Sequence, residues 1–223
     1  MKNENVKYDI GDKINDFVQK NRKAIVISIS VIFILLAGFI VFLSLNNVYQ
    51  KKAIAEMEEL NLRFEELRPS ISAKYNADVE ALLGELKVFA EKNGGIAGSK
   101  AWSMVAQIHC ERKEWQQAEE TWLKAARAGA KTYLGPISLF NAAAAAEEQG
   151  KLGRAIELLQ ECVDHKFEFP AAARAQFSIG RLYEELNNYP AAIEAYRAVI
   201  TNWQSVSTWH QLARSRIIAI ETR

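Results

Sequence analysis

Three segments of this chain follow one pattern at a constant spacing, and this repeat limits the possible folds more than any other feature of the sequence. They begin at Trp115, Leu152 and Tyr189, and so lie 37 residues apart. In each segment an alanine stands three positions after the first residue, and a large residue stands seven positions after it. The alanines are Ala118, Ala155 and Ala192, and the large residues are Trp122, Leu159 and Tyr196. A period of roughly 20 to 50 residues is typical of stacked supersecondary units.

A second helix is predicted before each of these segments. The stretches SKAWSMVAQIHCERK, PISLFNAAAAAEEQG and AARAQFSIGRLYEEL carry a small residue at the equivalent position, namely Ala106, Ala143 and Gly180. A small side chain at a helix contact lets the paired helix approach closely. Each unit is therefore predicted to be a helix pair, and the fold an all-α solenoid of about three pairs.

The last unit carries a short motif that points to a known repeat. Ile179, Gly180 and Tyr183 spell I-G-x-x-Y, and with the repeated alanines this makes residues 99–204 resemble the tetratricopeptide repeat family. The family period is about 34 residues, so each unit here has about three more. These extra residues are expected in the turns between units, around Pro136 and Pro170.

Amphipathic helices are predicted on both sides of the repeats. Residues 76–98 carry apolar side chains at helical spacing and reach Asn93-Gly94-Gly95, which favours a half-repeat or an N-terminal cap. Those apolar residues are Val79, Leu82, Leu83, Leu86 and Phe89. Residues 205–223 mix apolar with polar side chains and are predicted to be the capping helix that a repeat stack needs.

Residues 24–45 form a run of 22 residues without a charge. As a helix this run is about 33 Å long, enough to cross the hydrocarbon core of a bilayer. A cleaved signal peptide has a shorter apolar region, of about 7 to 15 residues, followed by a small-residue cleavage site. We therefore expect a retained, single-pass transmembrane helix.

Basic residues near the ends of this run suggest its orientation. Those before it are Lys13, Lys20, Arg22 and Lys23, and those after it are Lys51, Lys52 and Arg63. The tightest cluster borders the N-terminal end, and basic residues favour the cytoplasmic side. Residues 1–23 are therefore expected in the cytoplasm, and the repeat domain in the periplasm at a bacterial inner membrane. The tail itself fits either an amphipathic helix on the membrane surface or a solvated segment.

A stalk is predicted between the membrane and the repeats, over residues 46–75. Its apolar residues are spaced by three and four, as in a coiled-coil seam: Met57, Leu60, Phe64, Leu67 and Ile71. The seam lasts only about two heptads, so packing against the repeat domain and pairing with a second copy both remain open. Pro69 is expected to end the helix in either case.

The sequence offers no pattern for a catalytic, cofactor or metal site. His109, His165 and His210 lie far apart and lack ligand partners at metal-binding spacing. Cys110 and Cys162 read as small core residues, although a disulfide between them is not excluded. A net charge of +1, from 28 basic and 27 acidic residues, does not favour nucleic-acid binding.

The tetratricopeptide resemblance implies a concave groove, lined by the first helix of each unit, that holds extended peptides. By repeat register the predicted partner-binding residues are Lys100, Gln107, Phe140, Asn141, Arg174, Phe177 and Arg181. Asn141 and Arg174 match positions with which some family members clamp a C-terminal carboxylate. Ser103, Gln107 and Ser178 depart from that pattern, so carboxylate capture is not predicted. The alternative is a solvated groove whose phenylalanines pack between helices.

Together these features predict a membrane-anchored protein-interaction scaffold rather than an enzyme, since an enzyme needs convergent polar groups. A short cytoplasmic tail, one span and a small repeat domain resemble the ancillary subunit of the Sec translocon. That resemblance implies translocon or chaperone components as partners. The alternative is a structural scaffold of an envelope or flagellar assembly, and an enzyme is the remote third option.

Overall fold

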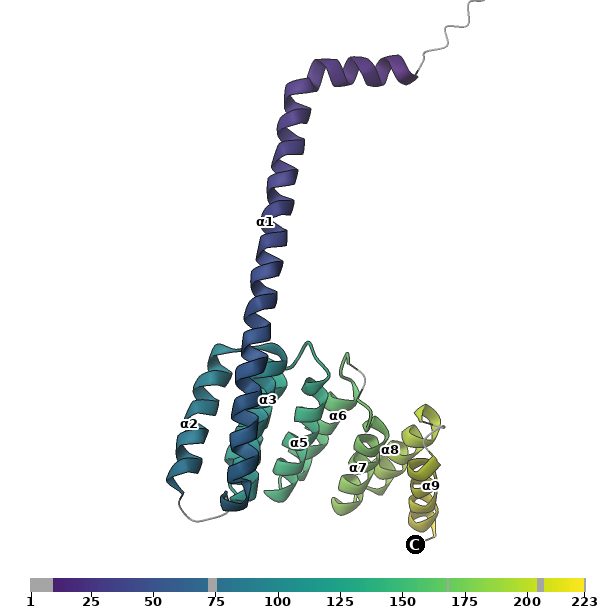
Figure 1. The fold of residues 1–223 in the computed structure, drawn as a ribbon. Helices are drawn as coiled ribbons and strands as arrows, with labels where there is room; N and C mark the ends of the chain where they lie inside the picture. The colour runs from purple at the N-terminus through teal and green to yellow at the C-terminus, as the bar shows by residue number, and fades with distance from the viewer. Residues whose placement is uncertain (1–9, 72–75, 168, 204–206, 223) are drawn as a thin grey trace, which may run out of the picture. The chain divides into compact units, whose positions relative to one another are not determined.

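The computed structural model describes residues 10–71, 76–167, 169–203 and 207–222. Within these residues the regular structure is helical throughout, which confirms the all-α prediction (Figure 1). The elements are α1 (Ile10–Leu67), a 3-10 turn (Arg68–Ser70), α2 (Ala77–Lys92), α3 (Gly95–Glu111), α4 (Trp115–Ala128), α5 (Leu134–Glu148), α6 (Leu152–Val163), α7 (Ala172–Glu185), α8 (Tyr189–Asn202) and α9 (Ser207–Glu221).

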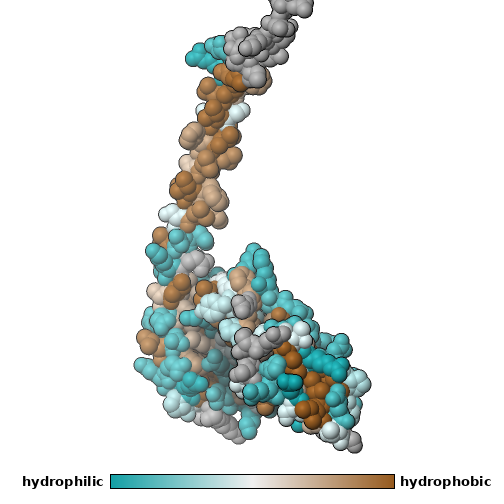
Figure 2. Space-filling model, turned by 90° about the vertical axis from the view of Figure 1, so that its right-hand side faces the viewer, coloured by the Kyte–Doolittle hydropathy of each residue, from teal (hydrophilic) through white to brown (hydrophobic). Residues whose placement is uncertain are grey.

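The chain divides into two units, Met1–Lys52 and Ala53–Arg223. The first unit is described from Ile10 to Lys52, a stretch of α1 that contains the apolar run. Its large apolar side chains are exposed along the whole run, from Val26 to Leu45, and form the brown column in Figure 2. Among the described residues this is one helix with the length and composition to cross a membrane, and it fits a membrane anchor or a signal segment.

The second unit is a stack of antiparallel helices in which each helix from α2 to α9 packs against its neighbours in the chain (Figure 1). In addition α3 contacts α5, and α7 contacts α9. Three helices begin at the residues that open the sequence repeats: α4 at Trp115, α6 at Leu152 and α8 at Tyr189. The pairs α3/α4, α5/α6 and α7/α8 therefore confirm the predicted helix-pair units.

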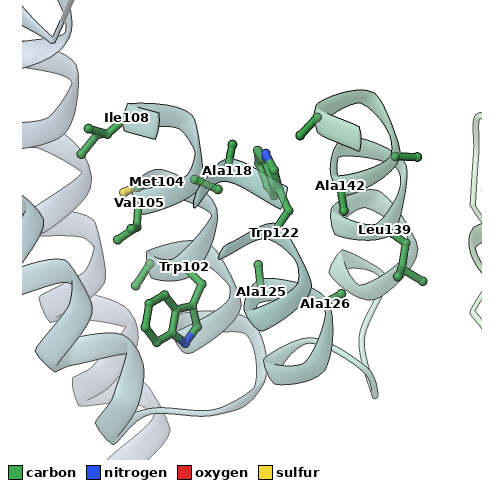
Figure 3. Packing of buried hydrophobic residues seen from close by; sticks show 14 of the residues in the cluster. Trp102, Met104, Val105, Ile108, Ala118, Trp122, Ala125, Ala126, Leu139 and Ala142 are labelled. Carbon is green, nitrogen blue, oxygen red and sulfur yellow. The ribbon is translucent and has the colours of Figure 1, made fainter. Parts of the chain in front are cut away.

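The repeated small residues lie at the helix contacts, as predicted. Ala118, Ala155 and Ala192 are completely buried, and Ala106 and Ala143 of the preceding helices are buried as well. Figure 3 shows the core that α3, α4 and α5 share, with alanines between larger side chains such as Trp102 and Trp122. Because adjacent helices meet through alanine, their backbones approach closely and each pair buries its apolar face on the next.

The turn inside each helix pair repeats as well. Lys113, Gly150 and Asn187 stand 37 residues apart, and their φ angles are 60°, 71° and 57°. In each unit the second residue after the first helix thus adopts the left-handed conformation that reverses the chain. Glycine adopts this conformation without a steric cost, whereas for lysine and asparagine the same conformation has a steric cost.

Of the predicted stalk, residues 46–75, the part from Ala53 to Ile71 contributes to the second unit's core, and residues 72–75 lie outside the described residues. Met57, Leu60, Phe64 and Ile71 are all buried, and they belong to the same apolar cluster as the core residues of α2 and α3. The Arg63 guanidinium also pairs with the Glu85 carboxylate of α2. This apolar seam therefore packs against α2 and α3 of the same chain and is not free to pair with a second copy. The helix ends at Leu67, and Pro69 lies in the following 3-10 turn, as expected.

Both flanking helices are present. At α2 the Asn76 side chain accepts a hydrogen bond of 2.9 Å from the backbone N–H of Asp78, which caps the helix N-terminus. At the other end of the stack, Ala213 and Ile220 of α9 are buried against α8. Arg216 of α9 donates a 2.9 Å hydrogen bond from Nε to Glu184 of α7, so a charged contact also fixes this helix.

Candidate partner-binding groove

The first helices of successive units enclose a hollow of about 260 Å³ in the second unit. Three elements supply most of its walls: α1 from Asn61 to Glu65, α3 from Lys100 to Gln107, and α5 from Leu134 to Asn141. The lining residues are Asn61, Phe64, Glu65, Lys100, Ser103, Met104, Gln107, Trp122, Leu134, Ile137 and Asn141. The structure thus brings together three of the seven predicted groove residues: Lys100, Gln107 and Asn141.

The hollow has an apolar floor and a polar rim. Phe64, Met104 and Trp122 are buried, whereas Lys100 is exposed. In the part of the chain that the structure describes, no carboxylate lies within ion-pair distance of the Lys100 ammonium. The only acidic residue in the lining is Glu65, and it pairs with Arg68 at 3.3 Å. The rim therefore offers a free ammonium group beside the amides of Asn141 and Gln107.

Two further predicted residues form a separate group. The Arg174 guanidinium lies 5.2 Å from the centre of the Phe140 ring, within the range of a cation–π contact. Phe140 also contacts Phe169, with ring centres 5.5 Å apart. Arg174 is exposed, so its guanidinium stacks on Phe140 while its N–H donors stay accessible. This pair is a second candidate contact point, outside the lining of the hollow.

The last two predicted residues have partners within the chain. The Phe177 ring lies between helices, 5.0 Å from the ring centre of Tyr196 and 5.4 Å from that of Trp209. Arg181 donates to both carboxylate oxygens of Glu147, at 2.7 and 2.6 Å. These contacts join α7 to its neighbours, so neither side chain is presented to a partner as openly as Lys100 or Arg174.

Sequence reasoning missed the contribution of α1 to the hollow. Asn61, Phe64 and Glu65 were placed in a stalk, yet they form one wall of the groove. The signal was present in the sequence, because Met57, Leu60 and Phe64 mark a buried face and place Asn61 and Glu65 at its edge. What the sequence did not reveal was which helix that face would meet.

Burial and pairing shift the pKa values of several groups in the second unit. Burial raises the pKa of the Cys162 thiol to about 12 and also raises that of Cys110, and neither cysteine is in a disulfide. The hydrogen bond from Arg63 lowers the pKa of Glu85. Burial, together with the hydrogen bond to Glu184, raises the pKa of Tyr196. These groups stabilise helix contacts and lie outside the lining of the hollow.

Comparison with known proteins agrees with this architecture. Residues 140–206 match the family model "Tetratricopeptide repeat". A "TPR repeat-containing protein" of Treponema pallidum (strain Nichols) is 35% identical over 146 residues, which are 65% of this chain and 60% of that protein. The chain thus spans about 60% of the length of this relative.

Solved structures share the fold. A crystal structure of a putative kinesin light chain with nearly identical TPR-like repeats from Podosopora anserina superposes with a TM-score of 0.51, over 74% of this chain and 91% of that one, at 15% identity. A second structure of the same protein gives a TM-score of 0.50, over 74% of this chain and 92% of that one. At this identity the likeness concerns the fold alone.

Proposed function

Since this chain is a tetratricopeptide repeat protein, we propose that it is a membrane-anchored scaffold whose concave groove binds another protein. The observation that carries the proposal is the hollow lined by α1, α3 and α5, in which an unpaired lysine and two amides stand over an apolar floor. Such a site suits an extended or helical peptide with both acidic and apolar side chains.

The energetics of this site favour a short acidic segment. The apolar floor provides the buried area, and Lys100 attracts a carboxylate that no neighbouring acidic group already occupies. Arg174, stacked on Phe140, would contact the same segment farther along the stack. Arg181 would contribute less, because a partner's carboxylate has to compete with Glu147 for its guanidinium.

The apolar part of α1 supports anchoring in a membrane. Its side chains are exposed along the whole uncharged run, so a hydrocarbon environment would bury them. We place the anchor in a bacterial inner membrane, with the repeats on the outer face and a role in protein translocation or folding there. The Treponema relative agrees with a bacterial setting.

Crosslinking in native membranes tests the groove. A photoreactive amino acid in place of Ser103, a lining residue, should trap a partner in the otherwise wild-type chain. Lys100→Glu should remove most of that product, since loss of an interface anchor costs about 2 kcal/mol or more. Lys131→Glu is the matched control, because Lys131 is an exposed lysine outside the hollow.

The outcomes separate the possibilities. Equal yields from Lys100→Glu and wild type, with both chains folded, would overturn the groove as the binding site. The identity of the trapped protein tests the finer role: translocon or chaperone components support it. Subunits of an envelope or flagellar assembly would instead favour a structural scaffold.

A further inference from the structure

The N-terminal part of α1 is bent. The helix is continuous from Ile10 to Leu67, yet Figure 1 shows its first, purple turns at a steep angle to the apolar part that follows. Just before the uncharged run, the side chain of Asn21 donates a 2.9 Å hydrogen bond to the backbone carbonyl oxygen of Phe17. A side chain that bonds to the carbonyl four residues earlier competes with the backbone ladder of the helix, and this is a known cause of bends. We call residues 14–23, on the N-terminal side of the uncharged run, the juxtamembrane segment.

Burial identifies the inner side of this bend. Between residues 14 and 49, Asn21 and Ile25 are half-buried, whereas all other residues whose side chains the structure describes are exposed. Within the described residues of the first unit α1 is the only element, so we attribute this cover to the two arms of the bend. Residues four apart stand one above the other on a helix, and Asn21 and Ile25 therefore mark one side of α1.

The apolar side chains of the juxtamembrane segment lie on this same side. Ile14, Phe17 and Val18 stand seven, four and three positions before Asn21. At roughly 100° per residue they lie within about 60° of Asn21 around the helix axis. They are 59%, 64% and 43% exposed. The inner side of the bend is also the side toward which the uncharged run leads, so a bilayer crossed by that run would meet these three side chains.

Basic side chains flank the apolar side of the segment. Lys20 and Arg22 lie roughly 100° to either side of Asn21. Over residues 14–23 there are three basic residues and one acidic residue. Lys20, Arg22 and Lys23 are exposed, and no ion pair joins them to another residue whose side chain the structure describes. Long basic side chains at the edge of an apolar face reach the headgroups of a bilayer while their stems stay at the apolar boundary. The segment therefore suits a surface of anionic lipid.

We propose that the juxtamembrane segment binds the anionic surface of the bilayer that the uncharged run enters. Ile14, Phe17 and Val18 insert at the boundary of the hydrocarbon. Lys20 and Arg22 contact the phosphate groups of the lipids. The inference rests on the anchoring role proposed for α1, and it favours the surface helix over the solvated segment, which would leave three large apolar side chains in water. Bound along the surface, the segment keeps the apolar run at one depth in the membrane.

Dye labelling of the full chain tests this contact. Val18→Cys reports on the apolar side of the segment, Gln19→Cys on the opposite side of the same turn, and Gly38→Cys on the uncharged run; all three residues are exposed. Each chain carries a nitrobenzoxadiazole dye on its new thiol, and wild type treated in the same way corrects for the native thiols. The chains are reconstituted in vesicles of phosphatidylglycerol and phosphatidylcholine whose acyl chains carry a nitroxide group, which quenches the dye on contact. The dye at residue 38 should be quenched strongly, and the dye at residue 18 several-fold more than the dye at residue 19.

Removal of charge tests the kind of lipid that is bound. Lys20→Gln with Arg22→Gln should lower the equilibrium constant of surface binding, read from quenching at residue 18, by about 25-fold, since each basic residue near an anionic surface contributes about fivefold. In vesicles of phosphatidylcholine alone the same pair of changes should have a much smaller effect. Lys51→Gln with Lys52→Gln is the matched control, because these exposed lysines follow the uncharged run at its other end, and it should leave the quenching unchanged.

Three results would overturn the proposal. Equal quenching at residues 18 and 19, with residue 38 quenched, would leave the membrane anchor intact and show that the juxtamembrane segment is solvated. Absence of quenching at residue 38 would overturn the anchor, and the surface site with it. Quenching at residue 18 that is the same with and without Lys20 and Arg22 in anionic vesicles would exclude anionic headgroups as the ligand.

Discussion

Tyr196 lies directly against the backbone of Gly180. A Cβ atom on residue 180 would stand 2.5 Å from Cε1 of the tyrosine ring, closer than any stable contact allows. The ring is fully buried and cannot turn away easily, because its hydroxyl donates a 2.6 Å hydrogen bond to Glu184. The approach of α8 to α7 in the last unit therefore depends on glycine at position 180.

Gly180→Ala should destabilise the second unit by about 1 to 3 kcal/mol, because the added methyl group displaces a held ring in a packed core. The matched control is Gly153→Ala, since a Cβ at residue 153 meets nothing within 4 Å. That change should be neutral or stabilising, by up to about 1 kcal/mol. Thermal denaturation of the full chain in detergent, followed by circular dichroism, compares the two. Equal melting temperatures would show that α7 and α8 do not meet at this residue.

Ala155 provides the corresponding test in the second unit. It is fully buried, and Ala155→Leu should overpack the contact between α5 and α6 at a cost of about 1 to 3 kcal/mol. Ala144→Leu is the control, because Ala144 also lies in a repeat helix but is exposed. A melting temperature for Ala155→Leu that equals that of Ala144→Leu would mean that the repeat register is wrong.

The repeat register explains why so much of the fold could be predicted. A small residue that recurs every 37 residues indicates a close contact between helices. The starts of α4, α6 and α8 could therefore be predicted at Trp115, Leu152 and Tyr189.

The candidate site was less predictable. Register places a residue on a helix face, but does not say which charges will pair: Arg181 pairs with Glu147, whereas Lys100 does not pair with any described acidic group.

The left-handed turns also escaped sequence reasoning. Gly150 and, to a lesser degree, Asn187 signal a positive φ by their identity, whereas Lys113 carries no such signal although it adopts the same conformation. It does so because the helix pair on either side fixes the geometry of the turn. Conformation there is imposed by packing between distant residues and overrides local preference.

This turn geometry predicts opposite effects for two reciprocal substitutions. Lys113→Gly should stabilise the second unit by roughly 0.5 kcal/mol, because relief of left-handed strain slightly exceeds the entropy lost by glycine. Gly150→Ala should destabilise it by about 1 kcal/mol, because alanine at a φ of 71° is strained. Urea denaturation measures both, and changes of the same sign would contradict a shared turn conformation.

The second unit should lose stability at alkaline pH. The folded-state pKa values of Cys162, at about 12, and of Tyr196 lie above those of the unfolded chain, about 8.5 and 10. Their contribution to the free energy of unfolding is therefore complete below the pKa values of the unfolded state. It is lost as the pH rises through the pKa values of the folded state. The free energy of unfolding should fall above about pH 9, by up to about 1.4 kcal/mol per pH unit for each group.

The Tyr196→Phe substitution separates the pH effect of the tyrosine from that of Cys162. It removes the hydrogen bond to Glu184, and so lowers stability at neutral pH, but it should flatten the decline between about pH 10 and 11. Urea denaturation at a series of pH values gives the slopes. The same slope for both proteins in that range would show that the tyrosine titrates equally in the folded and unfolded states.

The proposed topology makes a prediction for the two ends of the chain. Lys20, Arg22 and Lys23 border the uncharged run, and basic residues are retained on the cytoplasmic side. In intact spheroplasts a membrane-impermeant maleimide should label a Gly153→Cys chain, because residue 153 is exposed on the second unit. It should label an Asn3→Cys chain only after lysis.

Wild type is the control for the native thiols, and it should remain almost unlabelled, since burial keeps Cys162 in its thiol form and raises the pKa of Cys110. Labelling of Asn3→Cys before lysis, with Gly153→Cys protected, would reverse the orientation. Labelling of a soluble Gly153→Cys product that lacks residues 1–45 would instead identify the apolar run as a cleaved signal segment.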